Sequence, residues 1–500
     1  MSRVWSLRSG DGSVGRIDFV AEFGVWDAGR RACAERVEHD LDQVDLVRMV
    51  FCDPHGLARS KTLTADAFRR VLRNGMDFSA GPFLLDTGHG IAVDFLGVDA
   101  DVGVAELLGA GDFVVVPDPR TFQVLPDRQP ATAWVVGDEF LRDGRRHPLS
   151  SRDVLRRVCA DYAVRDLEPV VGLEVEWYLT RALGGPPGHP GNGFGLQGSA
   201  PAVEALNAGY QFNLDAYYDT LAPVTDPLAA ALGTLGLPLR SMEHESGPGQ
   251  VETTFAPLSA FDAADAMLLF RTFTKQYCAR RGHHASFMAL PMLESFDPSG
   301  WHLHQSVLST KTGANLFTGA PGEVLSPEGD AYVRGLQDRA RELCLLSVPT
   351  VNGYRRLRPE FGLSPSHADR SVEHRAAMVR LCGSGEGMHV ENRVGEPCAN
   401  PYLAIAAQLS AGLAGVADEP AVDSPSAPGC GVPLPQSLGE SLEAFRSGSA
   451  GSALLGGPLA TCLSKLKSSE LARFEAWCSE TQNPATEVTD WEHREYFEMY

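Results

Sequence analysis

The sequence predicts an α+β protein, in which strands and helices mix within each domain. Residues 44–52 are mostly apolar and β-branched and end in a turn at 53–56, which predicts a strand buried on both faces. Residues 170–179 share this β-branched and aromatic content. By contrast, residues 261–281 repeat apolar side chains at helical spacing and stop at Gly282. Strands and helices therefore occur along one chain, which predicts mixed domains.

The main domain boundary is predicted near residue 148. The polar turn 142–147 is followed by Ser150, which we expect to cap a helix with Asp153 three residues on. Residues 26–42 show helix-like spacing, and we expect them to belong to an appendage. The predicted units are an N-terminal extension (1–42), a small mixed domain (43–147) and a large domain (148–500).

Further elements are expected in the large domain. Residues 299–306 predict a strand with both histidines on one face, and 390–394 predict a second strand. Residues 332–346 predict a helix, and Asn400-Pro401 begins another, with Asn as cap and Pro in the first turn. A Pro/Ser/Gly linker at 418–433 precedes a mostly helical end.

Composition limits the classes of function. At 500 residues with 44% apolar residues, the chain can bury a large core. A formal charge of -21 argues against nucleic acid or an anionic membrane as the main partner, because either needs a basic face. No apolar run spans a membrane and no signal peptide is visible, so we expect a cytoplasmic protein. Ten cysteines without a C-x-x-C pair predict reduced, mostly buried thiols.

An acidic turn at 243–254 is the first candidate site. Glu245 and Glu252 lie on either side of a Gly-Pro-Gly turn, which can bring both carboxylates to one point. Taken alone, such a turn is more often a solvated loop than a cation site. Both interpretations stay open until other ligands are found.

Further acids and one histidine lie mostly on strand-like segments whose alternation gives them a common face. The complete set is Glu174, Glu176, Glu245, Glu252, His302 and Glu391. It is dominated by oxygen donors and therefore suits Mg²⁺ or Mn²⁺ rather than zinc, with enough ligands for two ions. Such a pair can clamp a polyphosphate in phosphoryl transfer. Taken singly, His302 is more often a structural histidine.

Four arginines, Arg356, Arg375, Arg380 and Arg393, are candidate donors to phosphate or carboxylate. Any one of them taken singly is more often a solvated surface charge.

The chain resembles the glutamine synthetase family along nearly its whole length. The motifs that carry the resemblance are 172–176 (GLEVE), 244–245 (HE) with 249–252 (GQVE), 300–306 (GWHLHQS), 352–357 (NGYRRL), 374–377 (HRAA), 391–393 (ENR) with 400–403 (NPYL), and 489–497 (TDWEHREYF). So many separate motifs in the correct order make chance similarity very unlikely.

The resemblance implies a β-grasp N-terminal domain and a catalytic domain with a curved antiparallel sheet around a funnel-shaped site. It implies that Glu176, Glu245 and Glu252 hold one metal ion. Glu174, His302 and Glu391 then hold the ion nearer the ATP phosphates. Arg356 and Arg393 bind the acid, Arg375 and Arg380 face the transferring phosphate, and His304 and Ser306 lie near the nucleotide. The implied chemistry makes an acyl phosphate from glutamate and ATP, which nitrogen attacks in a site closed to water.

Two positions depart from the ammonia-using members of that family. Those enzymes hold ammonium with an Asp in the first domain and a Glu on a mobile flap, which fall here near Ser79 and near Gly362 or Leu363. None of these three residues is acidic, and Asp77 and Glu360 remain alternative acids for the role.

Two further departures affect the glutamate end of the site. Asp297-Pro298 replaces an Asn-Gly, and Leu290 replaces a Lys. The identity of the acid substrate is therefore left open. No adenylylation Tyr is recognisable in the 418–433 linker, so that control is not expected.

The leading hypothesis is an ATP-dependent ligase that joins an acid, glutamate or a related compound, to an organic amine. The missing acids weaken an ammonium site and leave room for a larger amine. Ordinary glutamine synthesis and a non-catalytic sensor are the alternatives. The resemblance also implies a homo-oligomer, a dodecamer of two hexameric rings, whose sites are shared between neighbouring subunits.

Overall fold

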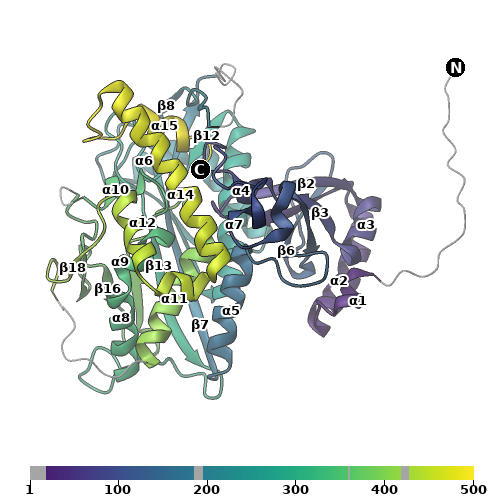
Figure 1. Ribbon diagram of the computed structural model, residues 1–500. Helices are drawn as coiled ribbons and strands as arrows, with labels where there is room; N and C mark the ends of the chain where they lie inside the picture. The colour runs from purple at the N-terminus through teal and green to yellow at the C-terminus, as the bar shows by residue number, and fades with distance from the viewer. Residues whose placement is uncertain (1–17, 185–194, 359–360, 418–426) are drawn as a thin grey trace, which may run out of the picture.

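The chain forms a small N-terminal unit beside a larger one (Figure 1). The structure, a computed structural model, describes residues 18–184, 195–358, 361–417 and 427–500. Each unit is built around its own sheet, and helices pack on both sheets. The predicted α+β class is therefore confirmed.

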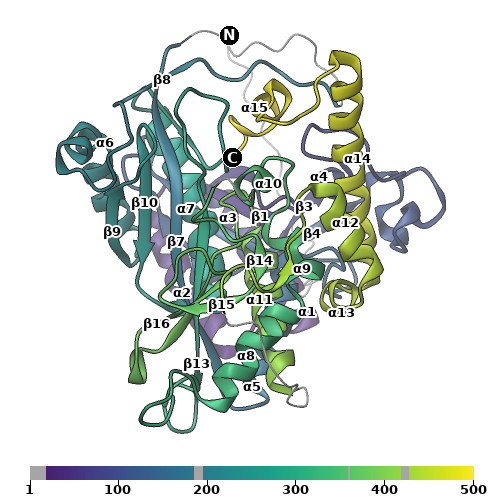
Figure 2. The same ribbon diagram turned by 90° about the vertical axis from the view of Figure 1, so that its left-hand side faces the viewer.

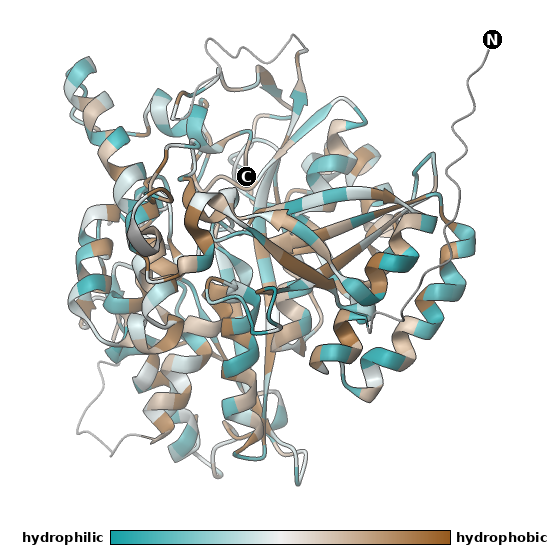
Figure 3. Ribbon diagram, turned by 45° about the vertical axis from the view of Figure 1, so that its right-hand side comes forward, coloured by the Kyte–Doolittle hydropathy of each residue, from teal (hydrophilic) through white to brown (hydrophobic). Residues whose placement is uncertain are grey.

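The small unit contains a mixed sheet with the strand order β2-β1-β6-β4-β3, and β5 pairs with β6. Its strands are β1 (Leu46–Cys52), β2 (Ala58–Thr64), β3 (Met76–Ser79), β4 (Asp112–Pro117), β5 (Gln123–Val124) and β6 (Thr132–Phe140). Strand β1 runs parallel to β6, and the other pairs are antiparallel. In Figure 3 the brown parts of this sheet lie mainly on β1, β4 and β6, whose apolar side chains form the core of this unit, whereas β2 is more polar.

Helices cover this small sheet. They are α1 (Phe19–Phe23), α2 (Ala28–Asp40), α3 (Ala65–Asn74) and α4 (Gly81–Leu84), with short 3-10 helices at Leu41–Gln43, Val98–Asp101, Ala105–Ala110 and Pro119–Thr121. Helix α3 buries Phe68 and Leu72 completely. The arrangement is consistent with the expected β-grasp domain.

The described part of the N-terminal extension packs on this unit. The indole of Trp26 donates to the carbonyl of Pro117 over 3.2 Å, and Arg30 donates to Asp118 over 3.2 Å. Residues 18–42 therefore lie against the small unit. The boundaries at residues 42 and 147 stay a prediction.

The large unit is built on a curled sheet with the strand order β15-β16-β17-β13-β7-β10-β9 (Figure 2). Its strands are β7 (Leu167–Ala182), β8 (Val203–Ala205), β9 (Leu239–His244), β10 (Gln250–Phe255), β11 (Leu258–Ser259), β12 (His283–Ser286), β13 (Trp301–Ser309), β15 (Arg370–Val372), β16 (Val379–Cys382) and β17 (His389–Asn392). All pairs are antiparallel except β15 with β16, as expected. The short strands β14 (His367–Ala368) and β18 (Val432–Pro433) form a separate pair.

Helices pack around this sheet and along the outside of the unit. They are α5 (Ser151–Ala163), α6 (Asp215–Thr234), α7 (Ala260–Ala279), α8 (Pro327–Asp338), α9 (Ala340–Ser347), α10 (Gly353–Arg356), α11 (Pro401–Ala417), α12 (Leu438–Ser447), α13 (Ala450–Leu455), α14 (Gly457–Thr481) and α15 (Asp490–Tyr496), with a 3-10 helix at Gly385–Gly387. Helix α11 contacts α5, α7 and α8. In Figure 1 the long helix α14 runs down the outer face.

Two local expectations, and one helix that was not expected, can be compared with these helices. The predicted cap is confirmed, since the side chain of Ser150 accepts from the backbone N–H of Asp153. The helix expected at 332–346 is instead two helices, which meet at Arg339, where ψ is 4° and the α-helical path is broken. Helix α6 was missed, because Pro223 and Pro227 lie inside it.

The cysteines and the helices can be compared with two further expectations, reduced thiols and no membrane span. All ten cysteines are free and six are buried, as expected of packing residues. Among the described residues, no helix combines the length and the apolar character that crossing a bilayer requires.

A buried group of charges joins the two units; we call it the junction cluster and define it as Arg30, Asp118, Asp138, Arg152 and Asp265. Arg152 from α5 lies 2.7 Å from Asp265 and 3.3 Å from Asp118, and it also pairs with Asp138. Burial alone would raise the pKa of Asp118 and of Asp138, but surrounding arginines outweigh it and lower both pKa values well below the ordinary one. Every acid of this cluster therefore has a cationic partner.

Candidate active site

The two glutamates of β7 lie on one face of the large sheet. Along an antiparallel pair, residues directly opposite each other share a face. Glu174 is opposite His302 of β13, and Glu176 is opposite Glu252 of β10. Three neighbouring strands thus bring four of the predicted ligands together.

The turn between β9 and β10 carries Glu245 to the same place. The backbone N–H of Glu245 donates to the carbonyl of Gln250, and the side-chain carbonyl of Gln250 accepts from the N–H of Gly247. Gly249 has a φ of +76°, and a Cβ there would lie 2.5 Å from the carbonyl oxygen of Leu179. Only glycine fits this position without strain, which explains the tight turn.

Histidines and Glu391 complete the face. One oxygen of the Glu174 carboxylate lies 2.6 Å from Nδ1 of His302, and the other lies 3.0 Å from Nε2 of His304. Nε2 of His302 accepts from Arg356 over 3.0 Å, so Nδ1 carries the proton that it shares with Glu174. Glu391 is opposite His304 in the strand pairing, and its side chain is fully buried.

The surroundings of these carboxylates shift their pKa values in opposite directions. Burial, with the negative charge of Glu176, raises the pKa of Glu245 to about 8. Burial, with the charges of Glu174 and Glu176, raises the pKa of Glu252 to about 10. Burial would also raise the pKa of Glu174, but hydrogen bonds from His302 and His304 outweigh it and lower that pKa well below its ordinary value.

Among the described residues, Glu176, Glu245 and Glu252 form no ion pair, whereas Glu391 pairs with Arg380 and Arg393. Buried carboxylates without a cationic partner are unfavourable unless an ion neutralises them.

In the part of the chain that the structure describes, two groups of side chains offer ligand atoms close enough together to bind a metal ion. Glu174, Glu252 and His302 form one, and Glu174, His304 and Glu391 form the other, with the ligand atoms of each group within 4.8 Å of one another. Glu174 belongs to both. Glu176 and Glu245, which were predicted as ligands of the first ion, lie outside both groups. In the second group His304, which was predicted to lie near the nucleotide, takes the place predicted for His302. Donors that are mostly carboxylates fit Mg²⁺ or Mn²⁺.

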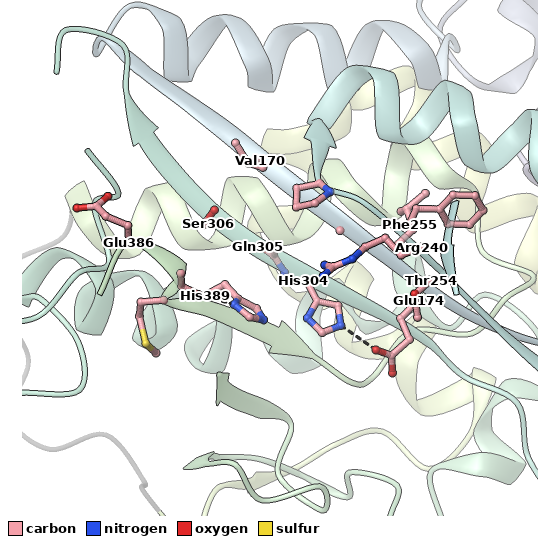
Figure 4. Close-up of a pocket in the computed structure, with 15 residues that line it drawn as sticks. Val170, Glu174, Arg240, Thr254, Phe255, His304, Gln305, Ser306, Glu386 and His389 are labelled. Atoms are coloured by element: carbon pink, nitrogen blue, oxygen red, sulfur yellow. Dashed lines mark hydrogen bonds and ion pairs between the residues drawn. The ribbon is translucent and has the colours of Figure 1, made fainter. Parts of the chain in front are cut away.

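One pocket opens on the His304 side of this acidic face; we call it the His304 pocket (Figure 4). Its volume is about 400 Å³, and it is lined in part by Glu174, Arg240, His304, Ser306 and His389. In Figure 4 the rings of His304 and His389 lie near each other, and their centroids are 5.2 Å apart. The two residues predicted to lie near the nucleotide, His304 and Ser306, therefore share one pocket.

A second pocket lies on the other side; we call it the Arg393 pocket. Its volume is about 510 Å³. The residues that line it are Glu176, Phe212, Glu245, Ser246, Gln250, Glu252, Asp297, Pro298, His302, Arg356, Phe361, Gly362, Leu363, Ser364, Arg375 and Arg393. Acidic, basic and apolar side chains all contribute, so it can accept a substrate with both charged and apolar parts.

The candidate arginines occupy different surroundings. Arg356 and Arg393 are buried side chains that line the Arg393 pocket, and Arg375 also lines it. Arg356 is held by the backbone carbonyl of Arg393, and burial lowers its pKa to about 10. Arg380 on β16 is 3.0 Å from Glu391 and also pairs with Glu373, so its charge is already compensated.

Ser79 and Gly362, the two positions where acids of an ammonium site are missing, lie in different parts of the structure. Gly362 lines the Arg393 pocket, but Ser79 lies at the end of β3 in the small unit and lines neither pocket. Asp77 pairs with Arg142 in that unit, 3.0 Å away. Glu360 lies outside the described residues.

Sequence reasoning did not assign Arg240, His389 or Phe212 to the site. Arg240 and His389 line the His304 pocket, and Phe212 lines the Arg393 pocket. His389 lies two residues before Glu391 on one strand, and this alternation was the available signal. Arg240 and Phe212 carry no such signal, because only the folded sheet brings them close.

Comparisons with known proteins agree with this geometry. The model of the glutamine synthetase catalytic domain matches residues 148–496. A gamma-glutamylanilide synthase from Acinetobacter sp is 34% identical, over 97% of this chain and 99% of that protein. A glutamine synthetase from Methanosarcina mazei is 28% identical, over 75% of this chain and 76% of its own.

Solved structures give the same result. The structure described as a novel glutamine synthase homolog aligns with a TM-score of 0.74 at 25% identity, covering 91% of this chain and 99% of its own. An ADP complex of GmaS aligns with a TM-score of 0.70 at 26% identity, covering 92% and 98%. The expected resemblance is confirmed, and the chain belongs to the glutamine synthetase family.

Proposed function

We propose that this protein is an ATP-dependent ligase that joins the γ-carboxyl group of glutamate to an aromatic or similarly apolar amine. The observation that carries the proposal is the meeting of two pockets at one acidic face. Glu174 lines the His304 pocket, while Glu252 and His302 line the Arg393 pocket, and these three side chains form one close group. A phosphate donor and an acid can therefore meet there.

The His304 pocket suits ATP. Arg240, His304 and His389 offer N–H donors to phosphate oxygens, and Ser306 offers a hydroxyl. A Cβ at Gly172 would lie 3.2 Å from the Cβ of His304, so glycine keeps this wall open. The ADP complex of the related GmaS supports this use of the pocket.

The acid occupies the Arg393 pocket, where Arg356 and Arg393 bind its carboxylates. An oxygen of the γ-carboxylate attacks the terminal phosphorus of ATP, an O–P bond forms, and ADP leaves. Arg375, which lines this pocket, would stabilise the negative charge of the transferring phosphoryl group; Arg380, which pairs with Glu373 and Glu391, is assigned to the same role by family resemblance alone. Holding both reactants on one rigid sheet removes the entropy cost of bringing them together in the reaction.

The unpaired acids fit a divalent cation. By family resemblance, Glu176, Glu245 and Glu252 would hold one Mg²⁺ or Mn²⁺, and Glu174, His302 and Glu391 another. The donor groups that lie closest together are instead Glu174, Glu252 and His302 for one ion and Glu174, His304 and Glu391 for the other. When bound, such ions supply neutralisation of phosphate charge during phosphoryl transfer.

The amine completes the reaction by attacking the acyl carbon. A C–N bond forms, phosphate leaves with the C–O bonding pair, and the nitrogen releases a proton. Phe212, Phe361 and Leu363 give the Arg393 pocket an apolar corner, and Gly362 and Ser364 add no charge. An aromatic amine is neutral near pH 7 and fits such a corner better than ammonium, which needs carboxylates around it. The name of the related gamma-glutamylanilide synthase supports this class of amine.

The test offers the enzyme ATP, Mg²⁺, glutamate and either ammonium, ethylamine or aniline, and it measures phosphate release and product mass. We expect aniline to give the highest kcat/KM. Rapid turnover with ammonium alone would identify a glutamine synthetase instead, and nucleotide binding without phosphate release would identify a non-catalytic relative.

A substitution at the flap sharpens this test. A Cβ at Gly362 meets no atom of the described residues within 4 Å, so a side chain can be added there. Gly362→Glu places a carboxylate beside the apolar corner and should shift the preference from aniline toward ammonium by about tenfold. Gly362→Gln adds the same bulk without the charge and is the matched control.

The assembly of the protein is part of the proposal. Ser79 lies in the small unit and reaches neither pocket of its own chain. By family resemblance we propose that twelve copies form two hexameric rings, in which the small unit of one copy completes the site of the next. Sedimentation measures this directly, and a monomer at micromolar concentration would exclude it.

A further inference from the structure

Helix α10, which carries Arg356, is only one turn long. A helix of four residues is not stable by itself, so contacts from the rest of the fold hold it in place. Its N-cap residue, Asn352, makes no side-chain hydrogen bond to the backbone of the helix. The position of the Arg356 side chain therefore depends on contacts from outside α10.

Arg356 has no carboxylate partner that fixes it. In the described part of the chain it forms no ion pair, and its guanidinium donates to the backbone carbonyl of Arg393 over 2.9 Å and to His302 over 3.0 Å. A buried guanidinium whose acceptors are neutral keeps its charge available for a carboxylate of a ligand. Binding of the acid then depends on where the backbone of α10 places this side chain.

Helix α15 anchors α10 through Arg355, the residue next to Arg356. Nε and Nη2 of Arg355 donate to the two carboxylate oxygens of Glu492 over 2.9 and 3.0 Å, which forms a bidentate pair. Asn352 donates to the same carboxylate over 3.2 Å. The backbone N–H of Val351 donates to the hydroxyl of Tyr496, also on α15, over 3.3 Å. Contacts with α15 therefore hold both the start of α10 and the residue before Arg356.

Glu492 is itself held firmly. Its side chain is fully buried and accepts from the backbone N–H and the hydroxyl of Thr489, each over 2.8 Å, in the capping box of α15. Glu492 and Arg355 line neither the Arg393 pocket nor the His304 pocket, whereas Arg356 lines the first of these. Glu492 therefore acts on the acid only through Arg355 and α10.

We propose that Glu492 is a positioning residue, which fixes Arg355 and thereby the guanidinium of Arg356 that binds the acid. This rests on the proposed function, because that function assigns the acid to Arg356. Loss of a supporting partner at metal sites lowers affinity by about 10- to 100-fold, and we expect the lower end of this range for the acid. The nucleotide should be unaffected, because no residue of α10 lines the His304 pocket.

The test uses the full-length protein with Mg²⁺ and calorimetric titrations of glutamate and of ADP. Glu492→Gln keeps the size of the side chain and removes its charge. We expect the Kd for glutamate to rise about tenfold and the Kd for ADP to stay unchanged. Asp490→Asn, on the same helix but in an ion pair with Arg494 at the surface, is the matched control and should bind both ligands like the wild type.

A double substitution tests the route through Arg355. Arg355→Gln should raise the Kd for glutamate by about the same factor as Glu492→Gln, and the double variant should raise it no further, because both substitutions break one pair. If Glu492→Gln does not fold, Arg355→Lys takes its place. It keeps the charge and loses the bidentate geometry, so it should raise the Kd for glutamate severalfold and leave the Kd for ADP unchanged.

The outcomes separate this inference from the proposed function. If Glu492→Gln, or Arg355→Lys in its place, binds glutamate like the wild type or weakens glutamate and ADP equally, the inference is overturned even where aniline is ligated. Additive effects in the double variant would also overturn it. If glutamate binding alone is weakened but no amine is ligated, the inference stands and the proposed function fails. If the wild type does not bind glutamate, both fail.

Discussion

The junction cluster and the acidic face of the large sheet are both buried groups of charges, and they are built in opposite ways. At the junction, Asp118 and Asp138 are surrounded by arginines, and their pKa values are lowered. On the acidic face, Glu245 and Glu252 have no cationic partner among the described residues, and their pKa values are raised.

Paired buried charges stabilise the fold, whereas unpaired ones serve the chemistry. A neutralised cluster needs nothing further to be stable, and its removal leaves charges unpaired. A cluster of acids without cations stores repulsion, which a bound cation relieves. The junction cluster therefore acts within the fold, whereas the acidic face is incomplete without a ligand.

The largest expected effect comes from breaking the junction cluster. Arg152→Met leaves Asp118 and Asp138 without their central partner and should lower the free energy of unfolding by about 3–5 kcal/mol. Urea unfolding followed by fluorescence measures this. Arg157→Met, on the exposed side of the same helix, should change stability by less than about 0.5 kcal/mol. Equal effects of the two substitutions would contradict the structural role of the cluster.

Removing an acid from the acidic face should have the reverse pattern, with lost activity and unchanged stability. Glu252→Gln should lower kcat by about 100-fold, because a metal ligand is lost. In the presence of a chelator, its stability should equal or exceed that of the wild type, since repulsion with Glu174 and Glu176 is removed. The exposed Glu168→Gln on the same strand is the control. Unchanged turnover in Glu252→Gln would remove it from the site.

A smaller effect comes from Glu139, next to the junction cluster. Burial raises its pKa to about 7, and one of its carboxylate oxygens has no hydrogen-bond partner among the residues that the structure describes. A raised pKa favours the folded state at low pH, and this contribution is lost as pH rises through about 7. Wild-type stability should therefore fall by about 2 kcal/mol more than that of Glu139→Gln between pH 5 and pH 7.5. Urea unfolding of both proteins at both pH values measures this difference. An equal change in the free energy of unfolding between the two pH values in both proteins would contradict it.

Local patterns in the sequence were sufficient for the strands that carry Glu174 and His302, for the Ser150 cap and for helix α7. Each depends on side-chain alternation, helical spacing or a cap, which act over a few residues. The family motifs then predicted which acids come together. The pairing of Glu252 with Glu176 brings distant segments together, and no local pattern determines it.

Features that depend on contacts between distant segments of the chain could not be predicted from local patterns. Helix α6 contains two prolines, so local propensity opposes a helix that tertiary packing stabilises. The contact of His304 with Glu174 depends on the register of β13 against β7, and the place of Phe212 in the Arg393 pocket depends on residues distant in the sequence. These are long-range contacts, which spacing along the chain does not encode.

Calorimetric titration of the metal-free protein with Mn²⁺ shows whether the acidic face is a two-metal site. We expect two bound ions per chain in the wild type and in Glu168→Gln, and at least one fewer in Glu252→Gln. A wild-type protein that binds no Mn²⁺, or a Glu252→Gln variant that binds two ions with unchanged affinity, would contradict it.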